Sequence, residues 1–318
     1  MNSRFLHPRY WPTWLGLGLL YLLSRLPYVW QMRLGAALGR GLLRVGRRRR
    51  FIAKCNIDRC FPELSAEARQ QLLLDHFAAL GMALFEVGLA WWGSAKLLKS
   101  LVKVEGIDHL YQALQAGRGA ILLGAHYTTI EIIGPFVALN CQAPIIALYR
   151  THENPLLDAF IRKGRERHLE KILGRDEIKA IVRAMRQNRV IWFASDQNYG
   201  HKNSLFTPFF NIAAATNTSP SRLAKLSNAP VLPLGSCRLP NHQGYVVTIS
   251  PPLEQFPTED LAADMIRINQ VIEERVRRCP EQYLWVHRRF KDRPPGEPTF
   301  YQAEQQDFSQ PRHGRAPK

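Results

Sequence analysis

The sequence predicts an α/β fold in which helices flank a mostly parallel β-sheet, preceded by an apolar N-terminal helix that anchors the chain in a membrane. Short runs at residues 119–124, 144–149, 190–194 and 231–235 are apolar almost throughout, as strands are when both faces of a sheet are covered. Helical patterns separate these runs, and strand–helix alternation is typical of a parallel sheet. Of the 318 residues, 46% are hydrophobic and 22% charged, which excludes a disordered chain and allows a substantial core.

The most apolar segment lies near the N-terminus, at residues 11–26. With its flank to Trp30 it comprises about 20 residues, enough for a helix to cross a ~30 Å hydrocarbon core. Trp11, Trp14 and Trp30 lie towards its ends, as aromatic residues do at membrane interfaces. A signal peptide is disfavoured because no cleavage site of small residues follows. We therefore expect residues 1–32 to form a single anchor that spans or inserts deeply, with a buried core helix as the alternative.

A cationic cluster follows the apolar segment. Residues 33–50 contain seven arginines and no acidic residue. Such a cluster marks the cytoplasmic side of a membrane segment and binds anionic lipid. The leucine, alanine, glycine and valine residues between the arginines favour a membrane-surface helix over a nucleic-acid-binding arm.

The net charge of the whole chain is +17, from 43 Lys and Arg against 26 Asp and Glu. This excess points to a polyanionic partner: nucleic acid, an anionic membrane, or an acidic protein or phosphorylated substrate. The charge alone does not distinguish among them. The basic and aromatic run at residues 285–291 has three possible roles: to bind nucleic acid, to lie on anionic lipid, or to hold His287 in a purely structural position.

The remaining elements follow in order along residues 33–301, which we expect to form one domain. A long amphipathic helix begins after Ser65, a helix-capping residue, and runs to Trp92. A fifth strand is expected at residues 246–249. Further helices are expected at residues 130–139, 154–173, 176–187, 218–227 and 260–279. The tail at 302–318 is almost without apolar residues and is expected to be disordered.

The five cysteines show no metal-binding spacing. Their odd number and scattered positions favour buried thiols in a reducing compartment over a disulfide framework. No cysteine has a local catalytic context, and no metal site is expected.

His126 has the strongest catalytic context in the chain. It follows a buried strand directly, at the carboxyl edge where α/β proteins place their active sites. Glu131 lies five positions later, so a turn between strand and helix could bring the two together. A carboxylate that accepts one imidazole N–H orients the ring and stabilises the imidazolium. Because no serine nucleophile motif accompanies the pair, we expect His126 to deprotonate a hydroxyl of the substrate.

Two neighbouring strands end on polar side chains as well. Arg150 ends the strand at 144–149, and a guanidinium there suits a phosphate or carboxylate, with a salt bridge between helices as the alternative. The segment 196–200, DQNYG, follows the strand at 190–194 and is otherwise read as a polar turn. Three consecutive strand ends with such side chains predict an active site at this edge.

The order of these motifs resembles the glycerolipid acyltransferase superfamily. His126 and Glu131 match its first block, Arg150 its second, residues 196–200 its third and residues 230–233 its fourth. Glutamate at the second position of the first block resembles the bacterial lipid A late acyltransferases, as do FLHPRYWPTWLGLGLLYLLSRLPY, CNIDRCFPELS, YRTHENPL, SDQNYG and PEQYLWVHRRFKDRPPGEP. These segments are similar to the lauroyl-type branch, and the resemblance covers roughly residues 3 to 301.

The resemblance implies a glycerolipid-acyltransferase-like fold and an O-acyltransferase of lipopolysaccharide biosynthesis. Such an enzyme moves a lauroyl or similar chain from acyl carrier protein to a 3-hydroxyacyl hydroxyl of a Kdo-bearing lipid A precursor. It works at the cytoplasmic face of the bacterial inner membrane, without a metal, a cofactor or a covalent acyl-enzyme. The expected partners are acyl carrier protein, anionic membrane lipid and the lipid A precursor, and no nucleic acid.

The same resemblance implies the roles of single residues. His126 is the base and Glu131 the carboxylate that orients it. Four further residues are expected to contact phosphates or to shape the site: Arg150, Arg165, Asp196 and Gln197. The two arginines would contact phosphates of the substrate or of the carrier's phosphopantetheine.

Two other functions remain open on the sequence. A glycerol-phosphate or lysophospholipid acyltransferase would use the same His126–Glu131 pair, but would not account for the matches near both ends of the chain. A basic nucleic-acid-binding protein would account for the charge of +17, but not for the anchor or the strand-end residues.

Overall fold

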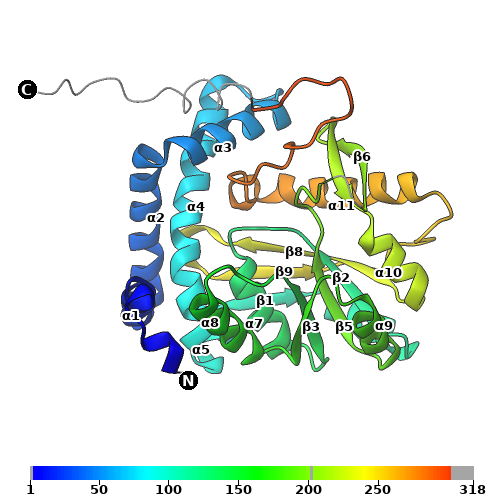
Figure 1. Cartoon of the computed structure of the whole chain (residues 1–318), viewed down its shortest axis with the longest axis horizontal. Helices are drawn as coiled ribbons and strands as arrows, with labels where there is room; N and C mark the ends of the chain where they lie inside the picture. The colour runs from blue at the N-terminus through cyan, green and yellow to red at the C-terminus, as the bar shows by residue number, and fades with distance from the viewer. Residues whose placement is uncertain (1–2, 201–202, 302–318) are drawn as a thin grey trace, which may run out of the picture.

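The computed structural model describes residues 3–200 and 203–301, and its centre is a seven-stranded sheet of order β1-β9-β8-β2-β5-β3-β4 (Figure 1). Neighbouring strands are parallel at every pairing except β8 with β9. The predicted α/β fold with a mostly parallel sheet is therefore confirmed. The strands are β1 (Val102–Glu105), β2 (Ala120–Gly124), β3 (Ile145–Tyr149), β4 (Lys171–Gly174), β5 (Val190–Ala194), β8 (Val231–Arg238) and β9 (Tyr245–Ile249).

The five strands expected from apolar runs are β2, β3, β5, β8 and β9. Four strands escaped the sequence patterns: β1, β4, β6 (Ser204–Phe209) and β7 (Ile212–Asn217). Lys171–Gly174 forms the edge strand β4, where a continuation of the preceding helix was expected. A separate antiparallel hairpin of β6 and β7 lies beside the sheet. β1 and β4 have only four residues each, and the hairpin strands include Ser, Thr and Asn, so apolar continuity does not reveal them.

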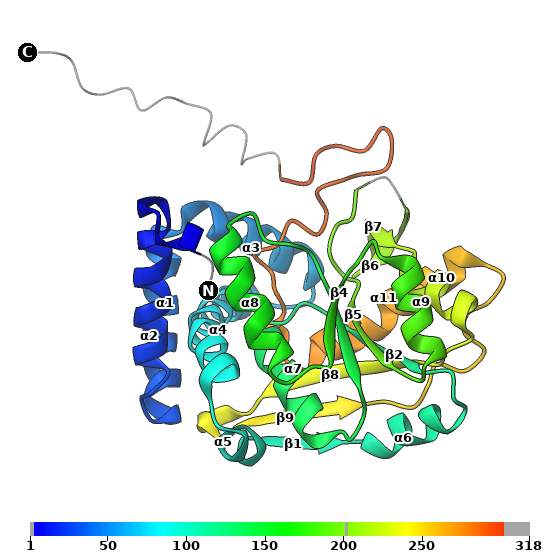
Figure 2. The same cartoon turned by 60° about the horizontal axis from the view of Figure 1, so that its bottom comes forward.

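Helices cover both faces of the sheet and one of its ends (Figures 1 and 2). Alternate residues of β2 show the two layers, because Leu122 packs with Ile132 of one cluster and Leu123 with Ile268 of the other. The helices are α1 (Trp11–Leu23), α2 (Tyr28–Val45), α3 (Arg47–Cys60), α4 (Ala66–Trp92), α5 (Ala95–Ser100), α6 (Ile107–Gln115), α7 (Ile130–Asn140), α8 (Pro155–Glu166), α9 (Ile178–Arg186), α10 (Ser219–Ser227) and α11 (Leu261–Arg278).

The expected single anchor helix over residues 11–30 is divided into two. α1 ends at Leu23, and α2 begins after Pro27, whose fixed φ and missing N–H disfavour a continuous helix. The 13 residues of α1 span about 20 Å, short of the ~30 Å of a hydrocarbon core. α1 by itself is therefore shorter than a helix that crosses the bilayer, and the anchoring role of residues 1–32 stays a prediction. The expected boundary at residue 32 also falls inside α2, and the expected tail at 302–318 lies outside the described residues.

α2 packs closely along α4, as both views show (Figures 1 and 2). Glycine makes this contact possible: a Cβ on Gly39 would lie 1.9 Å from the carbonyl oxygen of Phe77, and one on Gly81 would lie 2.0 Å from that of Gly35. α4 is the one helix in the described part of the chain that is long and apolar enough to cross a membrane. Because 61% of that stretch is buried, α4 has the packing of a core helix.

One expectation about the cysteines is wrong. Cys237 at the end of β8 and Cys279 after α11 form a disulfide, with Cα atoms 6.0 Å apart, within the usual range for such a bond. Cys60 and Cys141 are buried free thiols. The sequence spacing of 42 residues carried no sign of this pairing.

Candidate active site

His126 lies at the carboxyl edge of the sheet, in the turn between β2 and α7. Its ring Nδ1 is 2.7 Å from Oδ1 of Asp196, and its backbone N–H donates to the same oxygen at 2.9 Å. The pairing follows from the strand register, in which Gly124 of β2 lies beside Ala194 of β5. His126 lies two positions after Gly124, and Asp196 lies two positions after Ala194. Because Oδ1 of Asp196 is an acceptor, the proton of the neutral imidazole lies on Nδ1, and Nε2 is left to accept a proton.

Asp196 is buried, with 2% of its surface exposed, and holds a negative charge behind His126. Burial by itself raises the pKa of this carboxyl, but the interaction with His126 and hydrogen bonds from His126 and Tyr283 lower it to about 2. Burial raises the pKa of the Tyr283 phenol, so this hydroxyl stays protonated. Asp196 is therefore an ionised carboxylate that can stabilise a protonated imidazole.

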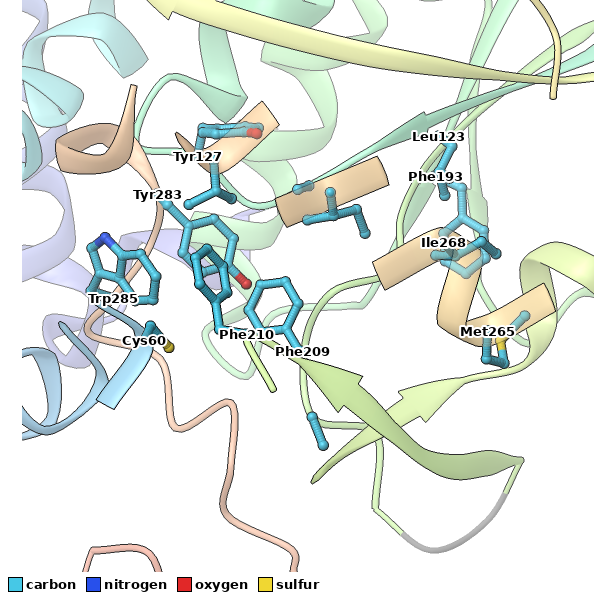
Figure 3. Close-up of a cluster of buried hydrophobic side chains, with 14 of the residues drawn as sticks. Cys60, Leu123, Tyr127, Phe193, Phe209, Phe210, Met265, Ile268, Tyr283 and Trp285 are labelled. Carbon is cyan, nitrogen blue, oxygen red and sulfur yellow. The ribbon is translucent and has the colours of Figure 1, made fainter. Parts of the chain in front are cut away.

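The turn that carries His126 is held by the C-terminal segment. Leu284 donates its N–H to the carbonyl of His126 at 3.0 Å, and Thr128 donates to the carbonyl of Gln282 at 2.7 Å. Behind the turn, Tyr127 and Tyr283 belong to a buried aromatic cluster with Phe209, Phe210 and Trp285 (Figure 3). Hydrogen bonds to the backbone of His126, as well as the contact of its ring with Asp196, therefore fix the position of the imidazole.

Glu131 does not contact His126 in the expected way. It lies in the first turn of α7 and accepts hydrogen bonds from the Arg165 side chain on α8, the shortest at 2.7 Å, and from Nε1 of Trp91 at 2.8 Å. The prediction that Glu131 orients His126 is corrected: Asp196 holds the ring. The first turn of α7 directs Glu131 towards α4 and α8, whereas the register of β2 and β5 brings Asp196 to the imidazole.

A cavity of about 570 Å³ opens at this edge of the sheet. Of the predicted site residues, four line it: His126, Arg150, Arg165 and Gln197. Asp196 lies behind His126, and Glu131 lies behind Arg165. The structure thus brings all six predicted residues to one region, with two of them in supporting positions.

The structure gives Arg165 a partner that the sequence did not predict, and its phosphate contact stays a prediction. Its guanidinium is engaged by Glu131, which raises the pKa of Arg165 despite the opposing effect of burial. Arg150 is exposed on the rim of the cavity. Arg175 and Lys291 line the same cavity, so its rim is cationic. A phosphate contact therefore remains a prediction for Arg150, and Arg165 acts first as the partner of Glu131.

The C-terminal segment supplies residues that the sequence motifs did not assign to the site. His287 lines the cavity, and its Nε2 accepts the backbone N–H of Asn198 at 3.2 Å. Burial lowers the pKa of His287 to about 4, so this ring is neutral at physiological pH. Trp285 and Phe290 are fully buried, which leaves neither ring available to stack on a nucleic acid base. The aromatic residues of the run at 285–291 are therefore structural, whereas His287 and Lys291 line the cavity.

Within the described residues, no three His, Cys, Asp or Glu side chains are close enough to hold a metal ion together. The chemistry that the site can perform with its own residues is proton transfer through His126. An ionised carboxylate behind an imidazole, in a cavity with a cationic rim, suits the activation of a hydroxyl beside an anionic ligand.

We expect Glu131 and Arg165 to act as a coupled pair. Glu131→Gln leaves the buried guanidinium without its charge partner, so activity and the thermal midpoint should both fall. The double variant Glu131→Gln/Arg165→Gln removes both charges and should recover part of each loss, with a coupling of about 0.5–3 kcal/mol. Turnover and thermal unfolding of the two single variants and the double variant measure it. If Glu131 acted on His126 directly, Arg165→Gln would restore nothing.

Comparisons with known proteins identify the family of the chain. The family model for bacterial lipid A biosynthesis acyltransferase matches residues 1–292. A lipid A biosynthesis palmitoleoyltransferase of Escherichia coli is 41% identical over 94% of this chain and 97% of its own. A lauroyltransferase of the same organism is 37% identical over 94% and 98%. A lipid A biosynthesis acyltransferase of Haemophilus influenzae is 35% identical over 92% and 94%. The chain belongs to the bacterial lipid A biosynthesis acyltransferase family.

Proposed function

We propose that the protein transfers a fatty acyl chain, lauroyl or of similar length, from acyl carrier protein to a 3-hydroxyacyl hydroxyl of a Kdo-bearing lipid A precursor. The observation that carries the proposal is the pair of His126 and ionised Asp196 at a cavity with a cationic rim. Two of the relatives named above are called a palmitoleoyltransferase and a lauroyltransferase. Family membership therefore leaves the length of the acyl chain open.

In the proposed reaction, Nε2 of His126 takes the proton of the acceptor hydroxyl as its oxygen attacks the thioester carbonyl. The negative charge of Asp196 stabilises the imidazolium that forms. When the tetrahedral intermediate collapses, the carbon–sulfur bond breaks and the proton on His126 passes to the departing thiolate of phosphopantetheine. The carrier's phosphate would lie at the rim, beside Arg150, Arg175 and Lys291.

The transfer can be tested with the purified protein, lauroyl-acyl carrier protein and a tetra-acylated, Kdo-bearing lipid A precursor. Mass spectrometry should show a product heavier by one acyl chain, and fragmentation should place that chain on a 3-hydroxyacyl group. Transfer to glycerol phosphate or lysophosphatidic acid with none to the precursor would overturn the proposal.

We also propose that α1 lies in the membrane interface rather than across the bilayer. Trp11, Leu15, Leu19 and Leu22 of α1 are between 56% and 77% exposed. α2 also exposes three leucines: Leu34, Leu38 and Leu42. α1 and α2 lie on the same side of the molecule, with α1 at the lower end of α2 in Figure 1. The arginines of α2 and α3 would meet anionic headgroups, as an inner-membrane enzyme facing the cytoplasm requires.

Charges placed on α1 should release the protein from membranes. We expect Leu15→Glu/Leu19→Glu to reduce binding to vesicles of anionic phospholipid, because both side chains would insert among the acyl chains. Leu226→Glu is a matched control, since Leu226 is also 57% exposed but lies on α10, across the molecule from α1 (Figure 1). Vesicle flotation measures the bound fraction. Equal binding by the double variant and the control would exclude α1 as the anchor.

A further inference from the structure

Trp192 occupies an unusual position in the sheet. It lies in β5, the strand between β2 and β3, with Leu122 and Ala147 as its register partners. Leu122 is fully buried and Ala147 is 3% exposed, yet Trp192 is only partly buried. The reason is that the catalytic cavity reaches down to the indole, with Ala147 and Ile130 beside it. Trp192 thus belongs, with Ile130 and Ala147, to the apolar part of the cavity lining.

Two glycines provide the space in which the indole lies. A Cβ on Gly134 of α7 would lie 3.0 Å from Cζ3 of Trp192, and one on Gly124 of β2 would lie 3.0 Å from its Nε1. Any larger residue at Gly134 must therefore push the ring by a few tenths of an ångström. The ring fills the layer between the sheet and α7, and its position is set by backbone on two sides.

Beyond the indole lies further space. A void of about 10 Å³ is lined by Trp192, Gly134, Leu169 and Trp91. Trp91 also lines a cavity of about 730 Å³ between α4 and α8. Trp192 and Arg165 are the residues common to the catalytic cavity and the void, and Arg165 is held by Glu131. The indole is therefore the apolar part of the wall between the catalytic cavity and the space behind it.

We infer that Trp192 limits the length of the acyl chain that the enzyme takes from its donor. The inference rests on the proposed function. With the thioester at His126 and the carrier's phosphate at the cationic rim, the acyl chain runs inward along Ile130 and Ala147. Its terminal methyl then meets the indole, which closes the apolar end. A chain longer than the cavity leaves methylenes in a strained or solvated position.

Shortening Trp192 should lengthen the accepted chain. We expect Trp192→Ala to raise kcat/KM for donors two carbons longer than the wild type's preferred chain, relative to that chain, by about tenfold. The assay uses acyl carrier protein loaded with decanoyl, lauroyl, myristoyl or palmitoyl chains, and one lipid A precursor as the acceptor throughout. A general loss of packing would lower all rates together and leave their ratios unchanged.

Gly134→Ala should act in the opposite direction, because its methyl group displaces the indole towards the catalytic cavity and favours shorter chains. Leu122→Val is the matched control: it removes volume on the same face of the adjacent strand without lining the cavity, and should leave the chain profile unchanged. An unchanged profile in both Trp192→Ala and Gly134→Ala, in enzymes that still transfer, would overturn the inference. No transfer by the wild type from any of the four donors would instead overturn the proposed function.

Discussion

Replacing His126 by alanine is expected to abolish acyl transfer, with kcat reduced by roughly a thousandfold or more. Nε2 of His126 is the proton acceptor in the proposed reaction, and the nucleophile is the hydroxyl of the acceptor itself. Without it, the acceptor hydroxyl stays protonated and attacks the thioester poorly. Single-turnover assays with acyl carrier protein as donor measure the loss directly, since they separate the chemical step from product release.

The variant should remain folded. The backbone N–H of His126 still donates to Asp196, and Tyr283 still donates to the same carboxylate, so the buried charge keeps two partners. His242→Ala, in the connection between β8 and β9 and outside the cavity, is the matched control and should keep full activity. Undiminished turnover in His126→Ala, with the acceptor acylated at the same position, would refute the mechanism.

Replacing Asp196 by asparagine should lower kcat by roughly 10²- to 10⁴-fold with little change in KM. The amide occupies the same volume but carries no charge, so the imidazolium that forms in the transition state loses its stabilising partner. Because the pKa of Asp196 is lowered to about 2, the wild-type carboxylate is ionised at every pH well above that value. The loss should therefore be nearly the same across the neutral range, as initial rates at several pH values will show.

Asp292→Asn provides the control for this variant. Asp292 lines the same cavity and accepts a hydrogen bond from Asn198 at 2.7 Å, but its partner is not His126. We expect it to lose much less activity than Asp196→Asn. Equal losses in the two variants would show that any neutralised carboxylate in the cavity has this effect, and that Asp196 has no special relation to the base.

Local patterns were sufficient for the general fold and for the position of the base. The apolar runs of β2, β3, β5, β8 and β9 indicate from the sequence alone that these strands are covered on both faces. Since parallel strands end at one edge, His126, Arg150 and Asp196 had to lie near one another. The edge strands β1 and β4 and the hairpin of β6 and β7 lack such runs and were not predicted.

By itself, the sequence determined the α/β architecture, the catalytic edge and the basic, apolar N-terminal region. Tertiary structure decided which side chains meet. The register of β2 and β5 brings the imidazole of His126 into hydrogen-bond contact with Asp196. The direction of α7 brings the carboxylate of Glu131 into contact with Arg165 and Trp91. Pro27 divides the expected anchor into two helices. Cys237 forms a disulfide with Cys279, 42 residues away in the sequence. Periodicity reports whether a residue is buried, whereas a contact depends on register and helix direction, which distant segments of the chain set together.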